Sequence, residues 1–188
     1  MPWAAEDPTR QPQRGRTAPG GLILRPPAIG DEAQLRAAHG ELAHEGFGFL
    51  FEPQLVWSDQ LSDFESQARG IDLPPGRVRA DFLVALVGSD LVGRVSIRHT
   101  LTPWLLELGG HVGYAVRPHF RRRGHATAML GLSVRRLADL GVAQVLVTCA
   151  EDNTGSIRVI ERCGGVLEDI RPIADGVPAT RRYWVTSR

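Results

Sequence analysis

One continuous stretch, residues 111–140, constrains the fold more than any other part of the chain. His111 to Val116 is rich in β-forming residues and is followed closely by Pro118, which predicts a strand that ends there. From Arg121 to Leu140, apolar residues recur at helical spacing, which predicts an amphipathic helix. A helix that starts directly after a strand has backbone N–H groups without partners in its first turn. The stretch therefore predicts an anion site at the helix N-terminus.

The connection between this strand and this helix reads Arg-Arg-Arg-Gly-His-Ala, residues 121–126. Gly124 and Ala126 are small, so a phosphate group can approach the backbone closely. The three arginines add positive charge for a phosphate-rich ligand. The glycine patterns GxGxxG and GxxxxGK(S/T) are absent from the sequence. Taken alone, the loop fits a phosphate site or a tight turn with solvated arginines.

A second motif lies further along the chain. Val142 to Cys149 predicts a strand, and Thr154 to Cys163 predicts a helix that ends at a Gly-Gly pair. Asn153 and Ser156 stand at the start of this helix, where both residue types commonly act as caps. A ligand contact from Asn153 is compatible with a capping role.

The remaining segments alternate between strands and helices. Helices are predicted over 31–44 and 58–69, with Ser58 as the cap of the second, and strands over 22–24, 82–87, 91–97, 166–170 and 183–186. The predicted order is β, α, α, β, β, β, α, β, α, β, β. Residues 1–20 are rich in proline and are predicted to form a disordered tail, and residues 21–188 are predicted to form a single domain.

Composition excludes several classes of function. The 22 basic residues are all arginine, so mechanisms that need a catalytic lysine are excluded, and 21 acidic residues leave a net charge of +1. Near-neutral charge argues against a nucleic-acid-binding protein, although the 121–123 patch leaves that alternative open. Two cysteines are too few for a disulfide framework or a zinc site of usual ligand spacing. No apolar run is long enough to span a membrane and no signal peptide is evident, so we expect a cytoplasmic protein without a bound metal.

The two motifs together resemble the GNAT superfamily of acetyl-CoA-dependent N-acetyltransferases. Residues 121–126 match the family's (R/Q)xxGx(G/A) loop, and residues 153–165 resemble its NxxSxxxxExxG helix. The chain is most similar to a bacterial branch with GGHxGYxVRP, here residues 109–118, and RRYW, here residues 181–184. The resemblance implies an α/β (α+β) fold with a mixed, mostly antiparallel central sheet flanked by helices. It also implies direct transfer of an acetyl group from acetyl-CoA to a primary amine of a small molecule or peptide, without an acyl-enzyme.

The resemblance further implies which residues hold acetyl-CoA. In the family, two central strands splay apart, and backbone N–H groups there hold the pantetheine and the thioester oxygen. The residues of this chain that match the family's binding positions are Tyr114, Ala115, Val116, Arg121, Arg122, Arg123, Gly124, His125, Ala126, Thr127, Asn153 and Ser156.

Candidates for proton transfer lie near the same strand. Glu107 and His111 are the available general bases, and His111 has the more suitable ordinary pKa. A histidine that only packs inside the sheet is the equal alternative. Many family members place a tyrosine seven residues after the Asn as the acid for the leaving thiolate, but this chain has Ile160 there. Tyr114, Tyr183 or a water molecule would then donate the proton, or the thiolate would leave unaided.

The acceptor site and the assembly state are less constrained by the sequence. The aromatic run 47–51, Trp57 and the loop around Trp104 are predicted to build the acceptor pocket, or to be ordinary core. The alternative to catalysis is a non-catalytic GNAT-like module that senses acyl-CoA. We expect a monomer or homodimer, with the strand around Trp184 either pairing across a two-fold axis or completing the sheet.

Overall fold

A computed structural model describes residues 21–187 of the chain. The predicted tail, residues 1–20, lies outside the described residues. Within them, no helix is long and apolar enough to cross a membrane.

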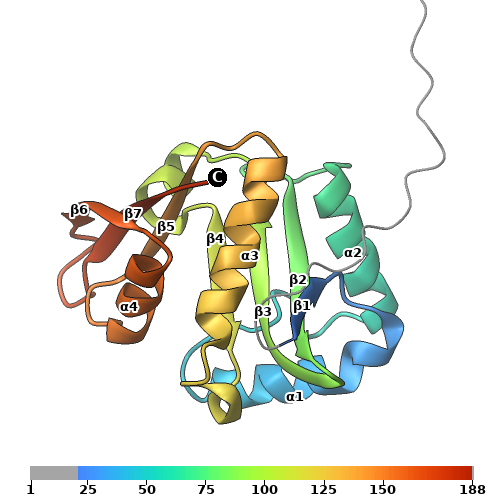
Figure 1. The fold of residues 1–188 in the computed structure, drawn as a ribbon. Helices are drawn as coiled ribbons and strands as arrows, with labels where there is room; N and C mark the ends of the chain where they lie inside the picture. The colour runs from blue at the N-terminus through green and yellow to red at the C-terminus, as the bar shows by residue number, and fades with distance from the viewer. Residues whose placement is uncertain (1–20, 188) are drawn as a thin grey trace, which may run out of the picture.

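Between residues 21 and 187, seven strands form two antiparallel sheets, and four α-helices lie around them (Figure 1). The first sheet has the order β1-β2-β3-β4, and the second has the order β5-β7-β6. The strands are β1 (Leu22–Arg25), β2 (Ala80–Val87), β3 (Asp90–Arg98), β4 (Val112–Val116), β5 (Gln144–Ala150), β6 (Val166–Arg171) and β7 (Thr180–Thr186). The helices are α1 (Glu32–Ala43), α2 (Trp57–Arg69), α3 (His125–Asp139) and α4 (Thr154–Arg162). The element order predicted from the sequence is confirmed, and so is the fold class of antiparallel sheet flanked by helices.

Two hydrophobic cores cover the opposite faces of the first sheet. Met129, Leu130 and Leu137 of α3 pack with Val95 and Ile97 of β3 on one face. On the other face, α1 and α2 pack against β2, and the aromatic run between the two helices joins this core through the fully buried Phe49. Since alternate residues of a strand point to opposite faces, the hairpin β2-β3 contributes side chains to both cores.

The two sheets touch where β4 begins and separate beyond that point. The His111 amide donates to the Leu146 carbonyl over 2.7 Å, and the Leu146 amide donates to His111 Nδ1 over 2.9 Å. Gly110 precedes this contact with a φ of +62°, and a Cβ atom there would lie 2.7 Å from the Leu146 carbonyl oxygen. Past His111, β4 continues in the first sheet and β5 in the second, so the strands diverge toward the start of α3.

Several boundaries differ from the sequence prediction. The third long helix starts at His125 instead of Arg121, because Arg122 and Gly124 have φ values of +63° and +83° that break the helical path. The second helix starts at Trp57 after Val56, so Ser58 is not its cap. A π-helix, Leu105–Gly109, occupies a segment predicted as loop. β7 lies between β5 and β6, so the strand around Trp184 completes its sheet.

The junction between the sheets yields a stability prediction. Gly110→Ala should lower the free energy of unfolding by about 2 kcal/mol or more, because it forces a strained φ and a clash with the Leu146 backbone. Gly131→Ala, inside α3 with only the tip of Arg135 at 3.8 Å, should instead raise it by about 0.5–1 kcal/mol. Urea unfolding measures both. Equal stabilities of the two variants would contradict the tight β4–β5 contact.

Candidate functional site

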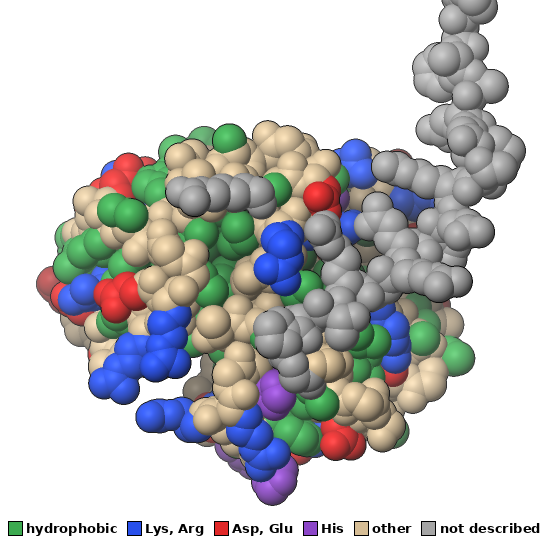
Figure 2. Space-filling view, in the orientation of Figure 1, with side chains coloured by type: hydrophobic (Ala, Val, Ile, Leu, Met, Phe, Trp, Pro, Cys, Tyr) green, Lys and Arg blue, Asp and Glu red, His purple; other side chains and the backbone are tan. Residues whose placement is uncertain are grey.

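A cavity of about 660 Å³ opens where β4 and β5 diverge. The first turns of α3 and α4 form two of its walls, and residues that follow α1 form a third. Figure 2 shows arginine side chains on both sides of a hollow at the lower left, beside the beginnings of these helices. The residues predicted from the sequence that line it are Tyr114, Ala115, Val116, Arg121, Arg122, Gly124, His125, Ala126, Thr127, Asn153 and Ser156.

The start of α3 presents a row of backbone donors to the cavity. Ala128 makes the first intrahelical bond, to the Gly124 carbonyl, so the N–H groups of residues 124–127 precede the helical ladder. Gly124 has a left-handed backbone, and no atom lies within 4 Å of the position that its Cβ would take. Because Gly124 lines the cavity, a side chain there would occupy part of it. The geometry is that of an anion site at a helix N-terminus.

The three arginines of the loop have different surroundings. Arg121 is bound to Glu45 through both terminal nitrogens, over 3.0 and 2.6 Å, and its Nε donates to the Val116 carbonyl. The guanidinium of Arg121 lowers the pKa of the Glu45 carboxyl by hydrogen bonding. Arg123 does not line the cavity and lies over the Phe120 ring at 5.7 Å. Of the three, Arg122 is the one that reaches the cavity without an ion pair to a described residue.

A second ion pair repeats this arrangement one turn earlier. Arg117 donates from Nε and Nη2 to the two carboxylate oxygens of Glu41, over 2.9 and 2.5 Å. The hydrogen bonds from Arg117 lower the pKa of the Glu41 carboxyl. Together, the Glu41 and Glu45 pairs fasten the end of α1 to the loop that precedes α3.

The α4 wall contains basic residues that the sequence analysis missed. Arg158 and Arg162 stand four residues apart on α4 and line the cavity opposite α3. Asn153 caps α4, since its Oδ1 accepts from the Ser156 amide at 3.0 Å. Residues four positions apart lie on the same face of a helix, so the spacing of Arg158 and Arg162 could have predicted that both arginines share one face of α4.

The backbone of β4 supplies donors on the side of the cavity. Just past the end of β4, the Arg117 amide donates to the carbonyl of Val92 in β3. In an antiparallel pair, the amides of successive residues point alternately toward and away from the partner strand. The Ala115 amide therefore faces β3, while the amides of Tyr114 and Val116 face the gap between the sheets. Two of the three backbone donors expected there have the required direction, and Ala115 does not.

The Tyr114 hydroxyl is a buried polar group at the wall of this cavity. It lies near the Ser156 side chain, yet it has no hydrogen-bond partner of normal geometry among residues 21–187. Burial raises the pKa of Tyr114 to about 12, so the phenol keeps its proton at neutral pH. An unsatisfied buried hydroxyl is costly and marks a place where a ligand atom can accept a hydrogen bond.

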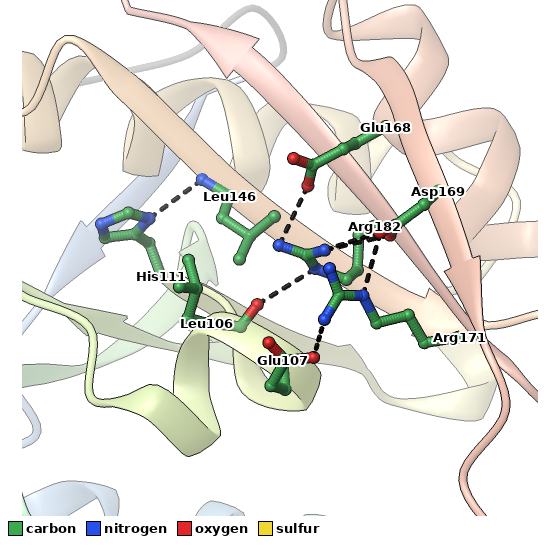
Figure 3. A network of polar contacts seen from close by, with 8 residues as sticks. All are labelled: Leu106, Glu107, His111, Leu146, Glu168, Asp169, Arg171 and Arg182. Atoms are coloured by element: carbon green, nitrogen blue, oxygen red, sulfur yellow. Dashed lines mark hydrogen bonds and ion pairs between the residues drawn. The ribbon is translucent and has the colours of Figure 1, made fainter.

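The two predicted bases, His111 and Glu107, are not among the residues that line the cavity. Figure 3 shows the polar contacts that each of them makes. His111 is 6% exposed, its Nδ1 accepts from the Leu146 amide, and burial lowers its pKa to about 4. In the neutral tautomer its Nε2 then carries the proton, so neither nitrogen has a lone pair free for a substrate. These contacts favour the alternative of a histidine that only packs and hydrogen-bonds within the sheet.

Glu107 belongs to an ion-pair network on the second sheet (Figure 3). It pairs with Arg171, which also donates to Asp169 over 2.9 Å. The buried Arg182 binds Asp169, Glu168 and the Leu106 carbonyl. The network holds the π-helix against β6 and β7 and engages one oxygen of the Glu107 carboxylate. Among the described residues, no cluster of His, Cys, Asp and Glu could hold a metal ion.

Several solved acetyltransferase structures share this architecture. RimJ of Mycobacterium smegmatis, in complex with CoA-disulfide, is 20% identical with a TM-score of 0.67 over 89% of this chain and 83% of its own. The microcin C7 self-immunity acetyltransferase MccE, with acetyl-CoA and AMP, is 20% identical with a TM-score of 0.63 over 90% and 97%. A spermidine N-acetyltransferase chimera from Vibrio cholerae and hSSAT is 16% identical with a TM-score of 0.61 over 88% and 95%. At these identities the similarity establishes the fold.

The family follows from the sequence match. The family described as acetyltransferase (GNAT) domain matches residues 21–166. The chain therefore belongs to the GNAT acetyltransferases, as its two motifs predicted. A search of curated proteins found no match.

The surroundings of His111 generate a prediction about acid stability. Its pKa is about 4 in the fold against an ordinary value of about 6.5, so between these pH values the unfolded chain binds more protons. The resulting stability is fully present above about pH 6.5 and is lost as pH falls toward 4, by up to about 3 kcal/mol. Unfolding in urea across this range should show a shallower pH dependence for His111→Asn than for the exposed control His44→Asn. Equal slopes would contradict a buried neutral His111.

Proposed function

We propose that the protein transfers an acetyl group from acetyl-CoA to a primary amine of a small molecule or peptide. The observation that carries the proposal is the open α3 N-terminus, with Gly124 at its tip, beside two diverging strands. The solved relatives in complex with CoA or acetyl-CoA support the choice of co-substrate.

The residues present fit such a co-substrate. The N–H groups at the start of α3 and the side chains of Arg122, Arg158 and Arg162 suit the phosphates of CoA. The gap between β4 and β5 suits an extended pantetheine arm, with the Tyr114 and Val116 amides as its hydrogen-bond donors. Arg121 would act through its ion pair with Glu45, by fixing the loop.

A bound thioester supplies an activated acyl carbon to the amine. In the transfer, a bond forms between the amine nitrogen and this carbon, and the carbon–sulfur bond breaks. The amine gives up one proton, which water accepts, and the thiolate takes up one proton to leave as the thiol. The Tyr114 and Val116 amides are placed to polarise the carbonyl, an electrostatic role of the oxyanion type.

Tyr114 is the candidate donor to the sulfur. Its hydroxyl is the buried, unsatisfied group at the cavity wall. Because its pKa of about 12 exceeds that of a thiol, about 8.5, full proton transfer to the thiolate is uphill. Tyr114 therefore stabilises the leaving thiolate through a hydrogen bond, and water completes the protonation. Ile160, where many family members have the acid, is fully buried in the core.

A non-catalytic sensor of acyl-CoA is the second candidate. The observation that favours it is the engagement of both predicted bases, His111 with Leu146 and Glu107 with Arg171. Release of free thiol from acetyl-CoA across a broad panel of amines separates the two. Binding of acetyl-CoA without thiol release from any amine would support the sensor.

Calorimetric titration with acetyl-CoA tests the location of the cofactor site. Gly124→Trp should abolish binding, because the indole would fill the space in front of the α3 amides. Gly141→Trp is the matched control, since Gly141 has the same φ of +83°, equally open surroundings and a position at the other end of α3. We expect both variants to be strained and only Gly124→Trp to lose the ligand. Unchanged binding by Gly124→Trp would remove the site from this helix.

The role of Tyr114 is tested by removing its hydroxyl. Tyr114→Phe should lower kcat by about 10- to 100-fold, the effect of one hydrogen bond to a charged group. Tyr183→Phe changes the only other tyrosine, which lies in the core on β7 and does not line the cavity. Steady-state thiol release measures both variants. A loss confined to Tyr183→Phe, or no loss in either, would remove Tyr114 as the donor.

A further inference from the structure

The middle strand β3 places two arginines on one face of the first sheet. Val95 and Ile97 point into the core under α3, so Arg94, Ser96 and Arg98 point to the opposite face. The register pairs Arg94 with Ala115 and Ser96 with Gly113 of β4. The proposed acyl-transfer strand is therefore flanked on this face by a row of Arg, Ser and Arg.

Arg94 carries a buried charge without an acidic partner. Its side chain is 4% exposed and donates to the carbonyls of Gly48 and Phe49, each over 3.1 Å. Its guanidinium lies 5.0–5.8 Å from the centroids of four phenylalanine rings, those of Phe47, Phe49, Phe51 and Phe82. No carboxylate of the described residues lies within ion-pair distance. Burial lowers its pKa to about 10, which still leaves it charged at neutral pH.

Arg98 is a second uncompensated charge, with donors left over. Its Nη1 donates to the carbonyls of Gly109 and Gly110, over 3.0 and 3.1 Å. Its Nε and Nη2, and the Ser96 hydroxyl, make no hydrogen bond to the described part of the chain. The acidic residue of the neighbouring strand, Asp81, lies on the other face, where Arg136 and His99 pair with it.

Gly113 of β4 leaves room for a side chain beside Arg98. Around the position that a Gly113 Cβ would occupy, the nearest atoms are Nη1 and Nη2 of Arg98, both at 3.9 Å. Gly113 directly precedes Tyr114, whose amide faces the gap between the sheets. Gly113 and the unused donors of Arg98 therefore lie beside the proposed position of the thioester, where the acceptor amine would bind.

We propose that Arg98, assisted by Ser96, binds a carboxylate of the acceptor, so that the substrate is a small amine of amino-acid type. This inference rests on the proposed acetyl transfer. A carboxylate would compensate the positive charge that no described acidic residue neutralises, and it would take the free Nε and Nη2 donors in a bidentate contact. Arg94 adds positive potential from beneath the aromatic run.

The same arrangement assists the reaction itself. Pairing with Arg98 cancels the stabilisation of the ammonium by the substrate's own carboxylate, and the charge of Arg94 stays uncompensated. A positive potential near the acceptor disfavours the ammonium form and lowers the pKa of the amine. More of the acceptor is then neutral and able to attack. This effect replaces part of the work of a general base, and both predicted bases are engaged elsewhere.

The experiment compares α-amino acids with their primary amides, which share size and shape but lack the negative charge. Acetyl transfer is followed by thiol release and by mass of the product. We expect kcat/KM at least about 10-fold higher for the acids. The amine of the amides is less basic, so a larger fraction of it is neutral and reactive at a given pH. A preference for the acids would therefore have to come from recognition of the carboxylate. Equal or better use of the amides would overturn the proposal.

Variants assign the preference to Arg98. Arg98→Met should raise KM for the acids by about 10- to 100-fold and leave the amides nearly unchanged, and Arg98→Lys should restore part of the preference. Arg69→Met, at an exposed site on α2, is the matched control. The acid-to-amide ratio is independent of the fraction of folded protein, because misfolding lowers both rates equally. An unchanged ratio in Arg98→Met would overturn the proposal.

A binding measurement separates this inference from the proposed function. If no amine is acetylated, N-acetyl amino acids and their amides are titrated calorimetrically into CoA-saturated protein. If the acids bind more tightly than the amides and Arg98→Met removes the difference, the carboxylate site is supported even though the proposed acetyl transfer is refuted. Binding that does not depend on the carboxylate, or no binding, would overturn the site as well.

Discussion

The pair of hydrogen bonds between His111 and Leu146 decides where the molecule opens. Strands β4 and β5 meet at this contact and then belong to different sheets, so their facing edges lack each other as partners. Unpaired backbone donors inside a protein are costly unless a ligand satisfies them. The junction that joins the two sheets therefore also produces the gap beside the cavity, and Gly110 is the residue that allows the close approach.

The distribution of carboxylates determines which arginines are left for ligands. Arg117, Arg121 and Arg182 are held in ion pairs and serve the architecture. Arg122 and the α4 arginines surround the cavity, and Arg98 stands without an acidic partner among the described residues. A chain with a net charge of +1 thus presents strongly positive sites, because its acidic residues are used at specific structural positions. Charge placement matters here more than total charge.

Sequence reasoning was strongest where the signal is local. The strand–loop–helix with Gly124 and the cap at Asn153 depend on neighbours within a few residues, and both were found. The start of α3 was placed too early, because the positive φ of Arg122 has no signature in an arginine. The Arg121–Glu45 pair and the role of His111 join segments 76 and 35 residues apart, and only the fold brings them together. Residue spacing in the sequence could not reveal that the lone pair of His111 Nδ1 accepts a hydrogen bond from the Leu146 amide.

The ion pairs of Glu41 and Glu45 with Arg117 and Arg121 connect the proposed phosphate loop to the wall of the proposed acceptor site. They fasten the end of α1 to the phosphate loop, and Phe47, two residues beyond Glu45, borders both the cavity and Arg94. Any order that the first ligand imposes on the loop is thereby passed to the wall that the second ligand meets. The conformational entropy of that wall would be lost only once, so each ligand would bind more tightly in the presence of the other.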